Sequence, residues 1–214
     1  MPLIRASVTP ATWQVYGSCR PTVWVVGHSF VYWACKRAKL RTGGTNFGFP
    51  NLEVNWRGIR GLRWRQIFPE LVDIAKKAKG PVVLVLHAGG NDLGKRKGAE
   101  LYTVMSTDID RFVCLLPDMV VVWSEIIPRA VWHGAKDVKA IENARKRINT
   151  KMSKFVRENY GIVVRHQELE GNNFALLRPD GIHLTDIGLD IFLEGLRDGV
   201  EQALMMLCGG RSPV

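Results

Sequence analysis

Two apolar runs constrain the fold of this chain more than any other feature. Residues 81–89 read PVVLVLHAG, and residues 119–127 read MVVVWSEII. Neither run alternates between apolar and polar residues, so each predicts a strand that is covered on both faces. Such strands are typical of parallel sheets that lie between two layers of helices.

The rest of the chain completes an alternation of strands and helices. Shorter apolar runs predict further strands at 22–27, 52–56 and 161–166. Amphipathic stretches predict helices at 29–38, 64–78, 98–115, 136–159 and 185–207. Pro69 indicates that the first turn of the second helix begins later, and Thr185 is suited to cap the last one. The pattern predicts a three-layer α/β/α protein with a five-stranded parallel sheet.

The length of 214 residues suits one domain with a sizeable core. The sequence contains no internal repeat, linker or low-complexity tract. We expect the domain to span 20–207, with flanks at 1–19 and 208–214 that read as the cut ends of a domain from a longer chain.

Composition excludes several classes of protein. Hydrophobic residues make up 46% of the chain and charged residues 23%, which excludes wholesale disorder. No apolar run approaches the roughly 20 residues of a membrane helix, and residues 1–20 lack the apolar stretch of a signal peptide. The four cysteines form no Cys-x-x-Cys pair, so neither a disulfide framework nor a zinc site is expected. We therefore expect a soluble intracellular protein, cytoplasmic or nuclear.

The charge balance is strongly basic. Thirty Lys and Arg residues against twenty Asp and Glu give a formal net charge of +10. A field of this sign favours polyanions such as nucleic acid, at least non-specifically. The basic residues are spread through the chain instead of forming a compact tail, so a solvated basic surface and a nucleic-acid-binding face both stay open.

Polar residues follow the ends of two predicted strands, where open α/β sheets bind their ligands. Ser29 lies at a strand-to-helix junction, where backbone N–H groups face an incoming anion. Asn91 follows Gly89-Gly90 after a central strand, and its side-chain amide is a candidate hydrogen-bond donor to an oxyanion. Each residue also has an ordinary structural role open to it, Ser29 as a helix N-cap and Asn91 as a turn residue.

A carboxylate and a histidine precede the last predicted helix. Asp180 lies three residues before His183, and on one turn it can reach the imidazole Nδ1–H. The pair can equally be half of a metal site. Between Ser29 and Asn91, either Gly58 or Gly61 can bring a backbone N–H close to a ligand.

Taken in chain order, these residues resemble the SGNH (GDSL-type) hydrolase superfamily over roughly 20–207. The resemblance implies a flavodoxin-like fold and a serine esterase that needs no cofactor and no metal. It implies that Ser29 is the nucleophile, His183 the base and Asp180 its orienting carboxylate. The oxyanion hole would comprise Ser29, Gly61 and Asn91. Gly61 is preferred to Gly58 because the glycine of this superfamily usually closes a G-x-x-G stretch.

One residue departs from the pattern of the superfamily. His28 replaces the aspartate that commonly precedes the nucleophile, as in G-D-S. That aspartate is neither nucleophile nor base, so catalysis need not be lost. His28 is interpreted as a structural or substrate-tuning variant, with altered or lost activity as the alternative.

Four runs resemble SGNH-type domains encoded by vertebrate retrotransposons and other mobile elements: WVVGHSFVYWA, LHAGGNDLG, VVWSEIIPR and DGIHLTDIGLDIFL. The absence of an extended apolar lid segment favours short acyl groups such as acetyl over lipid chains. The main alternative is a degenerate module that binds nucleic acid or assembles a particle. The missing G-x-G-x-x-G and P-loop motifs weigh against a nucleotide-binding domain. The Met205-Met206-Leu207 stretch is read as packing, with a homodimer contact as the alternative.

Several other residues have less specific interpretations. His87 is expected to be a hydrogen-bonded core residue, and His133 and His166 are expected at the surface or in loops. Arg129 follows the fourth strand, where it is either a ligand for an anionic substrate or a structural residue. Trp56, Trp64 and Trp132 are read as core residues, with a position lining the site as the alternative.

Overall fold

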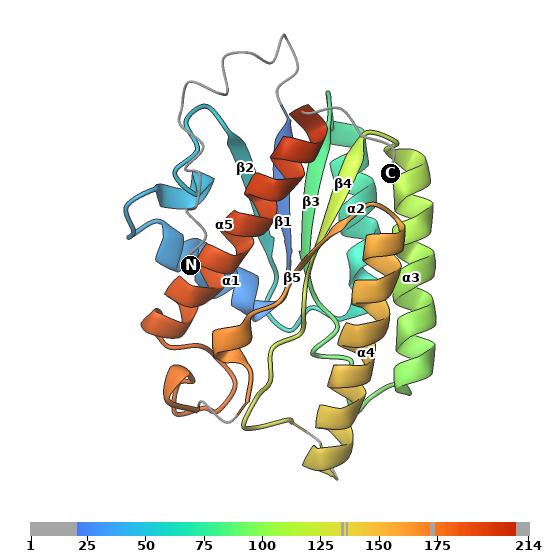
Figure 1. Ribbon diagram of the computed structural model, residues 1–214. Helices are drawn as coiled ribbons and strands as arrows, with labels where there is room; N and C mark the ends of the chain where they lie inside the picture. Colours follow the sequence, from blue (N-terminus) through green and yellow to red (C-terminus); the bar gives the residue numbers. More distant parts are fainter. Residues whose placement is uncertain (1–20, 134, 136, 172–173, 209–214) are drawn as a thin grey trace, which may run out of the picture.

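In the part of the chain that the structure describes, five parallel strands form one sheet. The computed structural model describes residues 21–133, 135, 137–171 and 174–208. Strands β1 (Thr22–Gly27), β2 (Glu53–Gly58), β3 (Val82–His87), β4 (Met119–Ser124) and β5 (Ile162–Val164) lie in the order β2-β1-β3-β4-β5 (Figure 1). All four strand pairs are parallel. The predicted α/β architecture is confirmed.

Helices cover both faces of this sheet. Helices α1 (Ser29–Ala38) and α5 (Asp186–Cys208) pack on one face (Figure 1). Helices α2 (Ile67–Lys77), α3 (Gly98–Leu115) and α4 (Val138–Glu158) pack on the other. All six side chains of β3 are buried, with Val83 and Val85 in one core and Leu84 and Leu86 in the other. Burial on both faces explains why this strand is a continuous apolar run.

The observed elements are shorter than some of the predicted ones. The runs 81–89 and 119–127 stop being strands at His87 and Ser124. Gly89, Gly90 and Asn91 form a loop after the end of β3, and the buried residues Ile126 and Ile127 lie beyond the end of β4. The predicted helix 64–78 divides into a 3₁₀ turn, Trp64–Gln66, and α2. Pro69 lies in the first turn of α2, where its missing N–H has no intrahelical acceptor to lose.

Some predictions fall outside the described residues. The flank 1–19 lies there entirely, and so does the flank 208–214 apart from Cys208, which ends α5. Across the described ranges, no helix combines the length and the apolar character that crossing a membrane would need.

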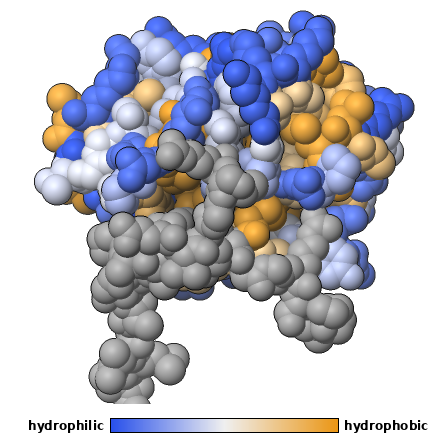
Figure 2. All heavy atoms as spheres, turned by 90° about the horizontal axis from the view of Figure 1, so that it is seen from above, coloured by the Kyte–Doolittle hydropathy of each residue, from blue (hydrophilic) through white to orange (hydrophobic). Residues whose placement is uncertain are grey.

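The end of the molecule where the strands begin carries apolar side chains at its surface (Figure 2). A hollow at this end is lined by Pro81, Val120, Met206 and Leu207 together with Asp118. Met205, on the last turns of α5, is 46% exposed. A homodimer contact at this end stays a prediction. The residues singled out for chemistry lie at the opposite edge of the sheet.

Candidate active site

Ser29, His183 and Asp180 form a hydrogen-bonded chain at the carboxyl edge of the sheet. The Ser29 Oγ lies 3.0 Å from His183 Nε2. The Nδ1 of His183 lies 2.7 Å from Asp180 Oδ2. The fold thus brings together residues that are 154 positions apart in the chain. This is the geometry in which an imidazole can take a proton from a hydroxyl while a carboxylate orients the ring.

Local structure explains the position of each member. Ser29 is the first residue of α1, directly after β1 and the N-cap residue His28. Asp180 and His183 lie on a tight turn before α5, where Asp180 Oδ1 accepts hydrogen bonds from the backbone N–H of Ile182 at 2.8 Å and of His183 at 2.9 Å. Gly181 has a φ of +66°, which glycine adopts without strain.

Hydrogen bonding controls the charge of Asp180. Partial burial opposes its ionisation, but hydrogen bonds from the His183 ring and from two backbone amides outweigh this effect and lower the pKa of Asp180 to about 2. Asp180 is therefore an anion at neutral pH. In this state it accepts the Nδ1–H of His183 and leaves Nε2 free to accept a proton.

The side-chain amide of Asn91 is held in one orientation. Its Nδ2 donates to the carbonyl oxygen of Leu62 at 2.9 Å, and its Oδ1 accepts from Arg129 Nη1 at 3.2 Å. An amide NH₂ carries two hydrogens, so one N–H is left for a ligand. Leu62 directly follows Gly61, so this hydrogen bond also joins the Asn91 loop to the Gly61 turn.

The two candidate glycines have different surroundings. A Cβ at Gly58 would lie 2.3 Å from the backbone nitrogen of Tyr32, so this glycine permits close packing of β2 against α1. Gly61 has a φ of +74° and open space around its missing Cβ. It lies in a turn closed by a hydrogen bond from the N–H of Leu62 to the carbonyl of Ile59. The structure therefore gives Gly58 a packing role, and Gly61 stays the proposed oxyanion donor.

Arg129 lies directly behind the Asn91 loop. Its guanidinium is 5.5 Å from the ring centroid of Phe30 and 5.1 Å from that of Trp132. Its Nε and Nη2 are buried, and neither has a hydrogen-bond partner among the described residues. Burial lowers the pKa of Arg129 to about 10, so it stays positive at neutral pH. A Cβ at Gly90 would lie 2.9 Å from Nη2, which explains the glycine there.

A row of buried polar side chains begins beside Ser29. His28 caps α1, because its Nδ1 accepts from the N–H of Phe30 at 3.4 Å. Its ring centroid is 4.8 Å from that of His87. Ser124 Oγ lies 2.9 Å from His87 Nδ1 and 2.8 Å from His166 Nε2.

Burial keeps the three histidines of this row neutral. Loss of solvation lowers the pKa of His28 and of His87 well below the usual range. It lowers the pKa of His166 to about 3. The acidic residue expected before Ser29 is thus replaced by a neutral imidazole that still accepts the capping hydrogen bond.

No family model and no curated protein matches this chain, whereas solved structures resemble it throughout. A GDSL-like lipase from Bacteroides thetaiotaomicron has a TM-score of 0.70 at 16% identity, over 86% of this chain and 89% of that chain. The family 3 carbohydrate esterase of Clostridium thermocellum has a TM-score of 0.64 at 18% identity, over 89% and 100%.

A psychrotrophic esterase from Pseudoalteromonas, solved with monoethylphosphonate as inhibitor, has a TM-score of 0.63 at 11% identity, over 86% of this chain and 98% of that chain. The chain has the fold of GDSL-type hydrolases. In this GDSL-type fold, the predicted residues Ser29, Asn91, Asp180 and His183 lie at one edge of the sheet.

His166 lies in a loop after β5, one of the two predicted positions, and it is buried there, with 4% of it exposed. The reason is on α5, where a Cβ at Gly195 would lie 2.8 Å from His166 Nδ1. A Cβ at Gly199 would lie 2.4 Å from Val164. Two glycines four residues apart on one helix were the signal that another element approaches closely.

The structure also places the other histidines and the three tryptophans singled out in the sequence. His87 is a hydrogen-bonded core residue and His133 is exposed, as predicted. Trp64 and Trp132 are buried, and Trp56 packs on Phe47. In the part of the chain that the structure describes, no group of three or more His, Cys, Asp or Glu residues is arranged to hold a metal ion.

Proposed function

We propose that this protein is a serine hydrolase that cleaves carboxylic esters through an acyl-enzyme. The observation that carries the proposal is the hydrogen-bonded chain from Ser29 to His183 to Asp180, with distances of 3.0 Å and 2.7 Å. The structural neighbours, which include a GDSL-like lipase and two esterases, support the same class of reaction.

In the proposed reaction, Ser29 Oγ attacks the ester carbonyl while His183 Nε2 takes its proton. Asp180 holds the ring and stabilises the imidazolium. The tetrahedral oxyanion accepts hydrogen bonds from the backbone N–H groups of Ser29 and Gly61 and from the free N–H of Asn91. His183 then gives its proton to the leaving alcohol. Water, activated by the same histidine, releases the acid and restores Ser29.

Short acyl groups such as acetyl are the proposed substrates, because the sequence lacks an extended apolar lid. The proposal includes a role within a mobile-element protein, which rests on the sequence runs that resemble such domains. The alternative function, a module that binds nucleic acid without turning over esters, is favoured by the formal net charge of +10.

Hydrolysis of p-nitrophenyl acetate and p-nitrophenyl octanoate by wild type and Ser29→Ala tests the proposal. Wild type is expected to turn over the acetate faster than the octanoate. Ser29→Ala is expected to lower kcat by several orders of magnitude, up to about 10⁶-fold. Equal rates in the two proteins would refute the esterase and favour the alternative. Preference for octanoate would refute the short acyl group alone.

A further inference from the structure

Two aromatic side chains of α1 lie beside the catalytic pair. Tyr32 and Trp33 follow Ser29 within the first two turns of α1, and their ring centroids are 5.2 Å apart. The centroid of the Trp33 ring lies 6.4 Å from that of His183. Both aromatic residues are partly exposed. A substrate held at Ser29 would therefore meet aromatic surface on this side.

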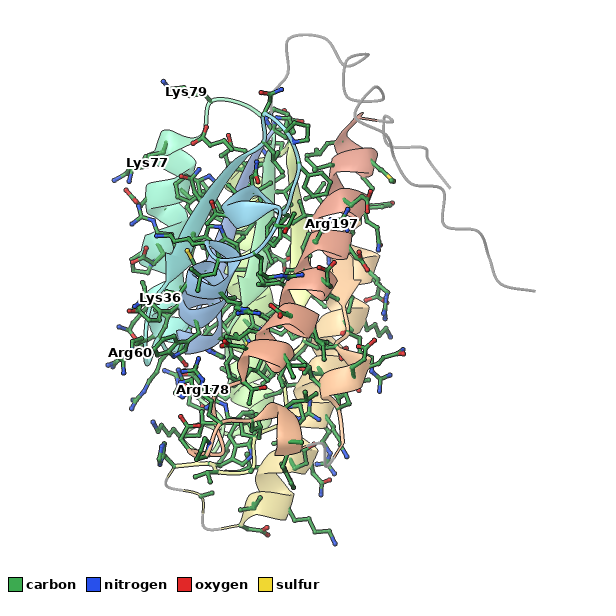
Figure 3. The ribbon with its side chains drawn as sticks, turned by 90° about the vertical axis from the view of Figure 1, so that its left-hand side faces the viewer. Lys36, Arg60, Lys77, Lys79, Arg178 and Arg197 are labelled. Atoms are coloured by element: carbon green, nitrogen blue, oxygen red, sulfur yellow. The ribbon has the colours of Figure 1, made fainter. Side chains whose placement is uncertain are left out.

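Three basic side chains surround these two rings, and we call Lys36, Arg60 and Arg178 the basic rim. The Lys36 ammonium lies 5.0 Å from the Tyr32 centroid and 5.5 Å from the Trp33 centroid. The Arg60 guanidinium lies 6.0 Å from the Tyr32 centroid, and the Arg178 guanidinium lies 4.4 Å from the Trp33 centroid. Figure 3 shows the three residues together toward the lower left, coming from three different segments.

The basic rim is not neutralised. Within the described ranges, none of its three residues forms an ion pair with a carboxylate. Arg178 Nε donates to the carbonyl of Leu184 at 2.9 Å, and this hydrogen bond holds one edge of the guanidinium in place. Three like charges gathered without a counter-ion attract an anion from solution.

Two other basic residues on the same side are paired. Lys77 Nζ lies 2.7 Å from a carboxylate oxygen of Asp73, and Arg197 lies 3.7 Å from Glu194. Both appear in Figure 3, higher on the molecule than the basic rim. Lys79, which Figure 3 also labels higher on this side, forms no ion pair within the described ranges. The basic rim is therefore distinguished by its position beside the catalytic residues, which suits one compact anion held near Ser29.

Two rim arginines are also tied to the reaction residues. Arg60 directly precedes Gly61, the proposed oxyanion donor. The backbone N–H of Arg178 donates to the carbonyl oxygen of His183 at 2.7 Å. An anion bound between these arginines is therefore held at a fixed position relative to the ester bond.

We propose that the ester cleaved at Ser29 carries a phosphate-type anion, and that the basic rim binds this group. The proposal rests on the proposed hydrolase function and names the substrate class of that site. Guanidinium groups match the geometry of phosphate oxygens, and the faces of Tyr32 and Trp33 accept the apolar part that joins phosphate to ester.

The test compares 4-acetoxyphenyl phosphate with phenyl acetate, which share the acetyl ester and differ in the phosphate. Wild type is expected to have a higher kcat/KM for the phosphate compound. In Lys36→Gln/Arg60→Gln, the ratio of the two kcat/KM values is expected to fall about tenfold, as for the loss of one charged contact. The control Lys77→Gln/Lys79→Gln removes the same charge away from the basic rim and is expected to keep the ratio. A ratio near one in wild type, or equal falls in both variants, would overturn the proposal.

Binding separates this proposal from the proposed function. Calorimetry with phenyl phosphate and Ser29→Ala is expected to show binding that weakens about tenfold when Lys36→Gln/Arg60→Gln is added. If that holds while wild type cleaves neither ester, the anion site stands and the hydrolase proposal fails. If wild type cleaves both esters equally and phenyl phosphate does not bind, the hydrolase stands and the anion site fails.

Two sources of the phosphate are then compared, the soluble ester and an acetyl ester of a phospholipid in vesicles. A higher kcat/KM for either phosphate-bearing ester than for the matching ester without phosphate supports the proposal. If neither phosphate-bearing ester is preferred, the proposal is overturned. Inhibition by a single-stranded oligonucleotide, at concentrations where phenyl phosphate has no effect, would overturn it in favour of polyanion binding.

Discussion

Arg145 and Arg129 both place guanidinium nitrogens out of contact with solvent near the end of β4, but their surroundings are opposite. Arg145, on α4, donates to Glu142 and Glu170 and to the carbonyl of Ile126. Arg129 has one hydrogen bond, to Asn91, and two aromatic rings. The charge of Arg145 is balanced by two carboxylates, whereas Arg129 has no carboxylate partner in the described part of the chain.

The pKa values of the two arginines follow this difference. Burial lowers the pKa of Arg145, but the hydrogen bonds and charges of Glu142 and Glu170 outweigh it and raise the pKa above the usual range. Burial alone acts on Arg129 and lowers its pKa to about 10. Burying a charge without a counter-ion is unfavourable for folding. The comparison therefore predicts a role in stability for Arg145 and a role in the candidate site for Arg129, whose charge lies behind Asn91, the proposed oxyanion donor.

The largest expected effect on stability is at Arg145. In Arg145→Met, Glu142 and Glu170 lose their shared cation, and the free energy of unfolding is expected to fall by about 3 kcal/mol. This value is at the lower end for a broken buried pair because both carboxylates stay partly exposed, at 28% and 22%. Urea denaturation at pH 7 measures it. A change below about 1 kcal/mol would contradict the structural role.

The opposite pattern is expected at Arg129. In Arg129→Met, kcat is expected to fall about 100-fold, as for loss of an oxyanion donor, because the Asn91 amide loses both its orientation and the charge behind it. The free energy of unfolding is expected to change by less than about 1 kcal/mol. Ester kinetics and urea denaturation of the same preparations measure both quantities.

The conservative variant distinguishes positioning from packing at Arg129. Arg129→Lys keeps the charge and is expected to retain more of kcat than Arg129→Met, with KM little changed in either. Equal kcat in both variants, or a stability loss as large as in Arg145→Met, would remove the distinction between the two arginines.

A further expected effect concerns the three buried, neutral histidines and appears only as the pH falls. Burial lowers the pKa of His28, His87 and His166, so below pH ~6.5 the unfolded chain binds more protons than the folded one. The stability is fully present above pH ~6.5. It falls as the pH drops from there toward 3, the value to which the pKa of His166 is lowered. Each histidine contributes at most about 1.4 kcal/mol per pH unit.

Urea denaturation at pH 7, 6 and 5 measures this slope. His166→Gln is expected to reduce it by at most about 1.4 kcal/mol per pH unit, and the exposed His133→Gln is expected to leave it unchanged. A slope that is the same in all three proteins would mean that His166 is not held neutral in the folded state.

The sequence was sufficient to predict the layers of the fold and the residues at its edge. The runs around Val83 and Val121 are apolar on both faces, and this pattern depends only on local residue order. Ser29 and Asn91 follow strand ends, and parallel strands end at one edge of a sheet. Topology alone therefore predicts that Ser29 and Asn91 lie together, whereas the position of His183 was expected from the resemblance to SGNH-type hydrolases.

Contacts between distant elements could not be predicted in the same way. The sequence places Arg129 after a predicted strand, but only the fold shows that Arg145, and not Arg129, contacts Glu170. His166 follows a strand in a polar stretch, and its burial depends on the path of α5. Element ends were also misjudged where buried residues such as Ile126 and Ile127 continue an apolar run beyond the last sheet hydrogen bond.

The glycines of α5 have a consequence for the reaction centre itself. The turn that carries Asp180 and His183 leads directly into this helix, and Gly195 lies about 14 Å along it. At Gly195 and Gly199 the helix rests on β5 and His166 with no side chain between them. The distance from His183 to Ser29 therefore depends partly on how closely α5 packs on β5, more than two helical turns from His183. The methyl group of an alanine at Gly195 would press on His166 and push α5 away from the sheet. Because α5 follows directly after the turn that carries His183, this displacement would also move His183 relative to Ser29.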